Sequence, residues 1–411
     1  MPRHSPRYRD LFRTPEFTPL FLASSVQVAA QTVSGLGLAT LVFRSTGSPL
    51  LSALALFGPS LAQLVGATTL LSAADRLPPR AALTTLALVF AAGTAAQAIP
   101  GLPVAAAFAV LFLQGLVGSV GGGVRYGLLT EILPRDRFLI GRSVMNMAVG
   151  GCQIAGFATG GLLLALLSPR GTLLTGAALY ALGALLARAG LTRRAPRATG
   201  RASAAETWRT NAKLWSARPR RHTYLALWVP NGLVVGCESL FVPYAPERAG
   251  LLFACAAAGM LAGDAVVGRF VPTAWRARLA APLQALLAAP YLLFALRPGP
   301  ALALVAVTVS AVGYSASLLY QERLMDLVPE ELSGHALGLH TSGMLALQGL
   351  SAALAGSLAQ LTSPATAMTL LAAGSLAVTC ALVALRERPG PGRRDTRPAD
   401  PACPAVPGDR R

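Results

Sequence analysis

Twelve long apolar runs are the feature that most constrains how this chain can fold. They fall at 19–43, 49–74, 80–99, 103–130, 141–167, 171–190, 222–245, 250–268, 277–296, 301–322, 333–361 and 365–385. Because about 20 apolar residues are enough for a helix to cross the hydrocarbon core of a bilayer, each run is long enough to be a transmembrane helix. Of the 411 residues 54% are hydrophobic and 13% are charged, about half the charged share of a soluble domain. The sequence therefore predicts an all-α polytopic membrane protein.

The basic residues fall mainly on one side of these spans. If the N-terminus is cytoplasmic, 30 of the 35 Lys and Arg residues lie in cytoplasmic segments and 4 lie in outer loops. Because basic loops stay on the cytoplasmic side during insertion, we expect a cell-membrane protein with both termini in the cytoplasm. Topology and lipid headgroups then account for the net charge of +18, and nucleic-acid binding is not expected.

The longest connection between spans divides the chain in two. Residues 191–221 are basic and polar, with little apolar periodicity. We expect a cytoplasmic linker there, between one six-helix bundle at 1–190 and a second at 222–385. Residues 386–411 are rich in Pro, Arg and Asp, which is typical of a disordered tail. The protein is expected to act as a monomer with membrane lipids around it.

Two internal matches support the division into halves. A shift of 195 residues aligns the Ser-Pro pair at 168–169 with that at 363–364. A shift of 189 residues aligns an Asp-x-x-x-x-Arg pattern in two interior loops, formed by Asp75 and Arg80 and by Asp264 and Arg269. A parallel six-plus-six repeat places the substrate pathway between the two bundles, near the middle of the bilayer.

At these residues the chain resembles the major facilitator superfamily (MFS). That family carries a G-x-x-x-D-R-x-G-R-R motif between spans two and three, often repeated in degenerate form between spans eight and nine, and residues 75–80 and 263–269 are similar to it. In span five the sequence GFATGG at 156–161 resembles the G-P-x-x-G-G pattern of exporters in this family, without its proline. Gln114 fits the glutamine of the family's R-x-x-Q-G pattern in span four. The resemblance implies a transporter of twelve helices in two six-helix bundles.

Glu238 is the candidate proton-coupling residue. It lies about fifteen residues into span seven, where an ionised carboxylate costs about 2.5–3.5 kcal/mol even on a lenient insertion scale. Protonation would remove that charge and change which arrangement of the bundles is favoured. Asn231, seven residues earlier on the same helix face, is a candidate substrate contact, and residues 230–232 (Pro-Asn-Gly) predict an irregular helix. The alternative is a structural carboxylate near the outer headgroups.

Neutral polar side chains in spans one and five are further candidate substrate contacts. In span one Ser24, Gln27, Gln31 and Ser34 share an arc about 80° wide. We expect them to form a hydrogen-bonding wall of the substrate cavity. The alternative is a set of contacts between helices, each worth well under about 1 kcal/mol. In span five Asn146 is a candidate for the same role, although the glycines beside it favour close helix packing.

Charged residues near the interior ends of the spans are predicted to act in conformational change. By the family resemblance, the aspartates of the two Asp-x-x-x-x-Arg loops dock on a neighbouring helix N-terminus, where the helix dipole favours an anion. The alternative is ordinary loop charge. Arg125 and Glu322 lie at similar depth in spans four and ten, and we expect them to pair when the cytoplasmic side closes. Arg125 could instead reach the headgroups or pair with Glu131 on its own helix.

No motif for catalysis or ATP hydrolysis occurs in the chain. Its single lysine, Lys213, lacks the glycines of a phosphate-binding loop, and there is no H-E-x-x-H sequence. His335 and His340 are five residues apart and do not share a helix face. We therefore expect neither an enzyme nor a bound cofactor or metal, and a protein that draws its energy from the proton gradient.

The leading hypothesis is a secondary active transporter that exports small amphipathic or drug-like molecules by proton antiport. One charge that moves through 100 mV releases about 2.3 kcal/mol, so a single protonatable side chain is enough to support accumulation. One alternative is an MFS uptake permease for a small polar nutrient. The other is a transport-silent membrane receptor or scaffold.

Overall fold

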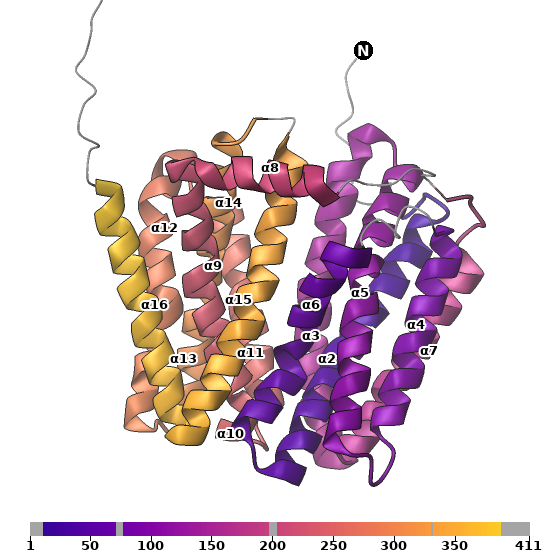
Figure 1. Cartoon of the computed structure of the whole chain (residues 1–411), viewed down its shortest axis with the longest axis horizontal. Coiled ribbons are helices and arrows are strands. Elements are labelled where there is room, and N and C mark those ends of the chain that lie inside the picture. Colours follow the sequence, from indigo (N-terminus) through magenta and orange to yellow (C-terminus); the bar gives the residue numbers. More distant parts are fainter. Residues whose placement is uncertain (1–10, 71–76, 197–203, 330–331, 388–411) are drawn as a thin grey trace, which may run out of the picture.

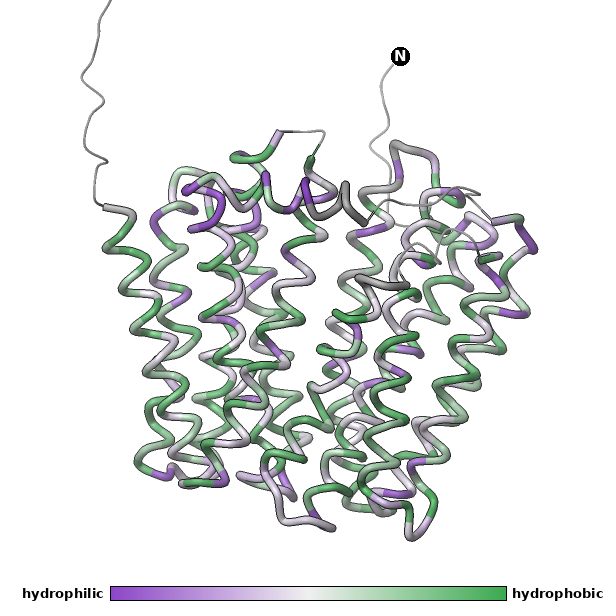
Figure 2. The backbone as a smooth tube through the Cα atoms, in the orientation of Figure 1, coloured by the Kyte–Doolittle hydropathy of each residue, from purple (hydrophilic) through white to green (hydrophobic). Residues whose placement is uncertain are grey.

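The computed structural model describes residues 11–70, 77–196, 204–329 and 332–387, which are almost entirely helical. Among them, twelve helices are long and apolar enough to cross a membrane. These helices stand side by side (Figure 1), with apolar residues along their middle and hydrophilic residues gathered toward both ends (Figure 2). The predictions of twelve spans and of an all-α membrane fold are confirmed.

The helices of the first half are α2 (Phe17–Thr46), α3 (Pro49–Leu70), α4 (Pro79–Gln97), α5 (Val104–Ile132), α6 (Arg135–Leu166) and α7 (Pro169–Gly190). The connecting segment contains α8 (Ala204–Ser216). The second half consists of α9 (Arg218–Ser239), α10 (Phe241–Tyr244), α11 (Ala249–Phe270), α12 (Thr273–Ala288), the 3-10 helix η2 (Ala289–Leu296), α13 (Pro300–Val312), the 3-10 helix η3 (Gly313–Ser315), α14 (Ala316–Asp326), α15 (Ser333–Leu361) and α16 (Pro364–Glu387). We call the end of the molecule where α2 begins and where α8 lies the basic end. The other end, where α2 finishes, is called the opposite end.

Proline explains where several spans begin. The helices α3, α4, α7, α13 and α16 all start at a proline, which has no N–H to leave unsatisfied in the first turn and a backbone angle already suited to a helix. The loops before them are short. At the end of α2, Gly47 closes the turn to α3 with a φ of 64°, a left-handed conformation that favours glycine.

At residues 230–232 the helix is not broken, because α9 continues through Pro230 to Ser239, and the irregularity there is one missing backbone hydrogen bond. Pro230 cannot donate a hydrogen bond to the carbonyl of Ala226, one turn earlier. The buried side chain of Gln284 donates to that carbonyl instead. A neighbouring helix thus satisfies the freed backbone group, as membrane helices with internal proline require.

Span ten is the irregular helix near the candidate proton site. It passes from α13 through the single 3-10 turn η3 into α14. At Gly313 a Cβ atom would lie 2.4 Å from the backbone nitrogen of Leu287, so only glycine allows span ten to approach span nine this closely. Tyr314, the next residue, is thereby placed toward α9.

The connecting segment is more structured than its composition indicates. Residues 204–216 form α8, where Leu214 is fully buried. The ring of Trp215 stacks on Trp228 of α9 with centroids 5.5 Å apart. The expected linker thus contains a helix that packs on the second half. Span seven also begins earlier than expected, at Arg218.

The two halves share an apolar core at one end only. At the opposite end a single cluster of buried residues includes Leu36 of α2 together with Phe241 and Phe253 of the second half. At the basic end the buried residues form two separate clusters, one in each half, which contain Leu128 and Tyr224 respectively. In Figure 1 the two halves accordingly converge toward the opposite end.

Candidate functional site

Glu238 lies near the end of α9 and receives a hydrogen bond from the hydroxyl of Tyr314, with 3.0 Å between the oxygens. The side chain of Cys237 beside it is fully buried, and Tyr291 is 1% exposed. Within the described residues no Lys, Arg or His forms an ion pair with this carboxylate. A carboxylate held in a span by a neutral hydroxyl can take up and release a proton without breaking an ion pair.

Asn231, two turns before Glu238, is buried in the same helix. Its Nδ2 lies 3.5 Å from the hydroxyl of Ser317 in α14. Its Oδ1 is buried without a hydrogen-bond partner among the described atoms. An unsatisfied buried amide oxygen is costly, so this atom is ready to accept a hydrogen bond from a solute.

The polar residues of span one do not form one continuous wall. Ser34 is buried against Gly176 of α7, where its hydroxyl would lie 2.0 Å from an added Cβ. It is therefore a contact between helices, which is the alternative that its sequence allowed. Gln27 faces the interior of the first half, whereas Gln31 is exposed. Because α2 is surrounded by several other helices, the polar residues along its predicted arc contact different neighbouring helices.

Arg125 donates a hydrogen bond from Nη2 to Oε1 of Gln27, at 3.0 Å. Glu322 is paired with Arg276 instead, through contacts of 3.0 and 3.2 Å. The predicted pair of Arg125 and Glu322 is therefore not formed in this conformation. Glu131 does not take its place, because it lies 3.6 Å from Arg194.

The two Asp-x-x-x-x-Arg loops are placed differently. Asp75 lies outside the described residues, and Arg80 is partly exposed in the first turn of α4. Asp264 is partly buried within α11 and forms no ion pair with a described residue. Arg269 is exposed, with its guanidinium 6.0 Å from the ring of Phe270. Docking of these aspartates on a helix terminus stays a prediction.

Span five is built for close packing, as its glycines indicate. An added Cβ at Gly156 would lie 1.8 Å from the hydroxyl of Thr32 in α2. At Gly161 it would lie 3.0 Å from the Cα of Gly250 in α11, across the boundary between the halves. The side chain of Asn146 lies outside the described part of the structure, so its role in substrate binding stays a prediction.

Sequence reasoning missed Tyr314 and the partner of Arg125. The signal for Tyr314 was its position between Gly313 and Ser315 in the middle of an apolar span, where a polar aromatic residue between small residues indicates a buried hydroxyl. Gln114, identified by its motif, is buried and donates to the carbonyl of Phe90 at 3.1 Å, a contact within the first half. Among the described residues, no group of three His, Cys, Asp or Glu side chains is placed to hold a metal ion.

Comparison with known proteins agrees with this architecture. The structure is similar to that of a POT family transporter in complex with 5-aminolevulinic acid (TM-score 0.72, 10% identity, covering 90% of this chain and 95% of that one). It is also similar to the peptide transporter POT in complex with sulfate (TM-score 0.71, 14% identity, 93% and 98% covered). A third similar structure is a bacterial homolog of the human lysosomal transporter Spinster in an inward-facing, unoccupied conformation (TM-score 0.66, 15% identity, 93% and 99% covered).

At these identities the structural likeness shows the fold. No curated protein matches the sequence. The model of the Major Facilitator Superfamily, however, matches residues 20–344, which is most of the chain. The chain is therefore a multi-pass membrane protein that belongs to the Major Facilitator Superfamily.

Proposed function

We propose that this transporter exports small amphipathic molecules by proton antiport, with Glu238 as the proton-coupling residue. The observation that carries the proposal is the carboxylate of Glu238 inside a membrane span with the Tyr314 hydroxyl as its partner. An ionised carboxylate within a membrane span is energetically costly, by up to about 2.5–3.5 kcal/mol at the centre of a helix on the insertion scale. Loading and unloading one proton therefore supplies a driving force for conformational change.

The coupling follows from the packing around Glu238. The residue lies in α9, which packs against α15 and α16, and Tyr314 lies at the break in span ten. The ionised carboxylate accepts the Tyr314 hydrogen bond more strongly than the protonated acid does. Protonation thus weakens a link between spans seven and ten in the second half, and changes which arrangement of the two halves is favoured. Inward proton flow through this step drives export of the solute.

Three observations support the substrate class and the direction. Gln31 is exposed and Oδ1 of Asn231 is unpartnered, so each half offers an amide to a small solute. The GFATGG stretch at 156–161, which resembles the exporter pattern, packs on α2 and on Gly250 of the second half. Two structures of the same fold hold 5-aminolevulinic acid and sulfate, which are small molecules. We place the basic end and both termini in the cytoplasm of the cell, in accord with the positive-inside rule.

The variant Glu238→Gln tests the coupling. We expect it to keep the fold and to lose proton-driven accumulation by at least about tenfold, because glutamine cannot carry a proton through the cycle. Glu247→Gln is the matched control, since Glu247 is an exposed carboxylate in the α10–α11 connection. The measurement is accumulation of a fluorescent dye in proteoliposomes with an imposed pH gradient. Equal accumulation by both variants would remove Glu238 from the proposal.

Vesicle orientation tests the direction of transport. We expect everted vesicles with an acidic interior to accumulate the dye, because their interior corresponds to the outside of the cell. Accumulation in right-side-out vesicles alone would instead indicate an uptake permease. No proton-dependent movement in either orientation, for a broad panel of solutes, would favour a receptor or scaffold.

A further inference from the structure

Arg125 is a membrane-embedded cation for which the described chain supplies no counter-charge. Among the described residues, its guanidinium donates one hydrogen bond, to the neutral amide oxygen of Gln27. Its Nε is buried and has no hydrogen-bond partner among the described atoms. A guanidinium carries five N–H donors, so Arg125 has donors left for a further ligand.

Three described glutamates that are candidate partners of Arg125 bind other arginines instead. Glu16 binds Arg194 through two contacts, of 2.8 and 3.1 Å. Glu131, six residues after Arg125, lies against the same Arg194. Glu322, the partner predicted from the sequence, is neutralised by Arg276. Each of these described carboxylates therefore has an arginine other than Arg125.

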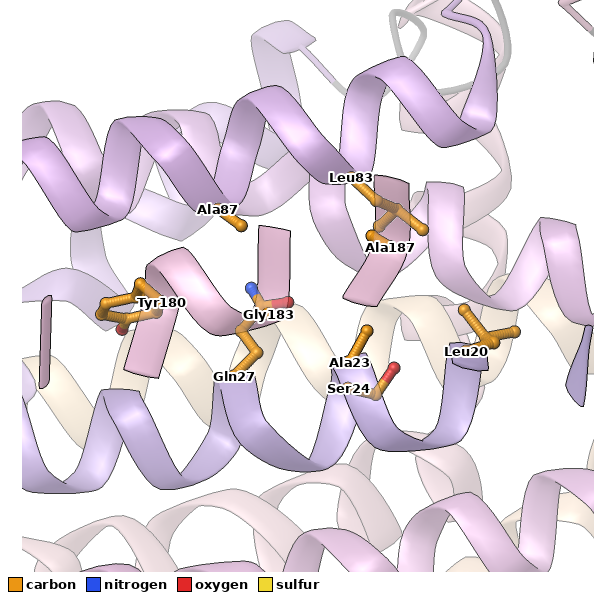
Figure 3. A pocket seen from close by; sticks show the side chains of 9 residues that line it. All are labelled: Leu20, Ala23, Ser24, Gln27, Leu83, Ala87, Tyr180, Gly183 and Ala187. Atoms are coloured by element: carbon orange, nitrogen blue, oxygen red, sulfur yellow. The ribbon is translucent and has the colours of Figure 1, made fainter. Parts of the chain in front are cut away.

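The surroundings of Gln27 are suited to an anion. A small cavity beside it is enclosed by α2, α4 and α7, and its polar lining residues are Ser24, Gln27 and Tyr180 (Figure 3). All three can donate a hydrogen bond, and because Oε1 of Gln27 accepts from Arg125, its Nε2 remains available as a donor. No lining residue is acidic. This cavity has room for about one water molecule and is not lined by Arg125, so it supplies neutral donors beside Gln27 and is not itself the position of the anion.

The energetics favour a bound anion. An arginine within a span is energetically costly, and a neutral amide offsets only part of that cost. Charge-assisted hydrogen bonds from a guanidinium to an anion are about twice as strong as those between neutral groups. An anion that enters between α2 and α5 would both neutralise the charge and satisfy Nε.

We propose that Arg125 and Gln27 bind an anionic group between α2 and α5. The group is either a free inorganic anion such as chloride or the carboxylate of a transported molecule. In the second case the proposal rests on the transport function and narrows its substrates to amphipathic anions. In the first case the site is a separate ion site in the first half of the molecule.

The test measures thermal unfolding of the purified full-length protein in a nonionic detergent at constant ionic strength. Sodium gluconate, a bulky polyhydroxylated salt, is replaced stepwise by sodium chloride in one arm and by sodium benzoate in another, with neutral benzamide as the comparison for benzoate. We expect chloride or benzoate to raise Tm by about 2 °C or more, since a ligand that binds the folded state stabilises it. Benzamide should have no effect.

Two variants assign the effect to this pair. Arg125→Gln should abolish the anion-dependent increase, whereas Arg142→Gln, which removes an exposed guanidinium stacked on Tyr126 at 5.6 Å, should preserve it. Gln27→Glu places a carboxylate beside Arg125, so it should raise the baseline Tm and remove the response to added anion. The Gln27→Glu variant keeps the test decisive if Arg125→Gln does not fold.

The outcomes separate the two sources. A response to chloride alone indicates an inorganic ion, and a response to benzoate alone indicates a carboxylate of an organic solute. No increase with either probe in the wild-type protein, or an unchanged increase in Gln27→Glu, overturns the proposal. The measurement involves no transport, so its failure leaves the role of Glu238 untouched, and the failure of proton-driven transport leaves the anion site untouched.

Discussion

The two ends of the molecule are stabilised by different kinds of contact. At the opposite end, one apolar core runs across both halves and helices approach at backbone distance, as at Gly161 and Gly250. At the basic end, each half has its own core, and the contacts include ion pairs such as Arg194 with Glu16 and Arg276 with Glu322. Neither of these ion pairs joins the two halves.

This difference shows which end of the molecule is closed in this conformation and which contact between the halves must open during transport. The halves are closed at the opposite end and apart at the basic end, which under the proposed topology faces the cytoplasm. Access of the substrate site to the other side of the membrane requires the two halves to separate at the shared core of the opposite end. A contact made of glycines and apolar side chains, including the stacked rings of Phe157 and Phe253, can separate and reform without desolvating charges. The ion pairs at the basic end do not join the halves and need not break when the halves move.

The largest effect is expected from a covalent link at the opposite end. Nε2 of Gln360 donates to the hydroxyl of Ser48 across the halves, at 2.5 Å. In a background without the five native cysteines, the double variant Ser48→Cys/Gln360→Cys should cross-link with a short bifunctional thiol reagent and lose nearly all transport. Each single variant is the control. When the reagent is a bis-methanethiosulfonate, which attaches through two disulfides, reductant should cleave the cross-link and restore transport. Full transport by the cross-linked protein would show that this end need not open.

A smaller but still large loss is expected when the close approach of the halves is blocked. In Gly250→Leu the new Cβ would lie 2.4 Å from the Cα of Gly161, so the opposite end cannot close as it does here. Transport in proteoliposomes should fall about tenfold. Gly268→Leu is the matched control on the same helix, because nothing lies within 4 Å of a Cβ there. Similar rates for the two variants would contradict the role of this contact.

The smallest effect is expected at the basic end. The side chains of Arg276 and Glu322 are 30% and 42% exposed, and ion pairs this exposed contribute about 0.2–1 kcal/mol. Arg276→Gln should therefore change the transport rate by less than about fivefold and Tm by a few degrees at most. A tenfold loss would mean that this ion pair governs the open state, and the two ends would then be less different than their packing indicates.

How much was predictable differs between the scaffold and the site. The positions of the twelve spans followed from hydropathy, because the free energy of placing a helix in a bilayer is close to a sum over its own residues. The packing role of the span-five glycines also followed from composition alone. By contrast, the expected wall in span one failed for Ser34, since the side chain's neighbour depends on how α2 is rotated against α7.

Pairings were the least predictable feature of the candidate site. The sequence placed Arg125 and Glu322 at similar depth, but depth does not determine which helices are adjacent. In the structure α12 lies beside α14 and supplies Arg276 to Glu322, while α2 supplies Gln27 to Arg125. Each of these partners is more than 40 residues away along the chain, so no local pattern encodes the contact.

By itself the sequence determined that this chain crosses a membrane twelve times, carries its basic loops on one side and buries a carboxylate in span seven. These properties depend on transfer of single residues between water and lipid, and neighbours change them little. Only the tertiary structure decided that Tyr314 faces Glu238, that Arg125 meets a neutral amide and that the halves close at one end. Those contacts depend on helix rotation, on breaks such as η3 and on glycines that permit close approach, which act between segments far apart in the sequence.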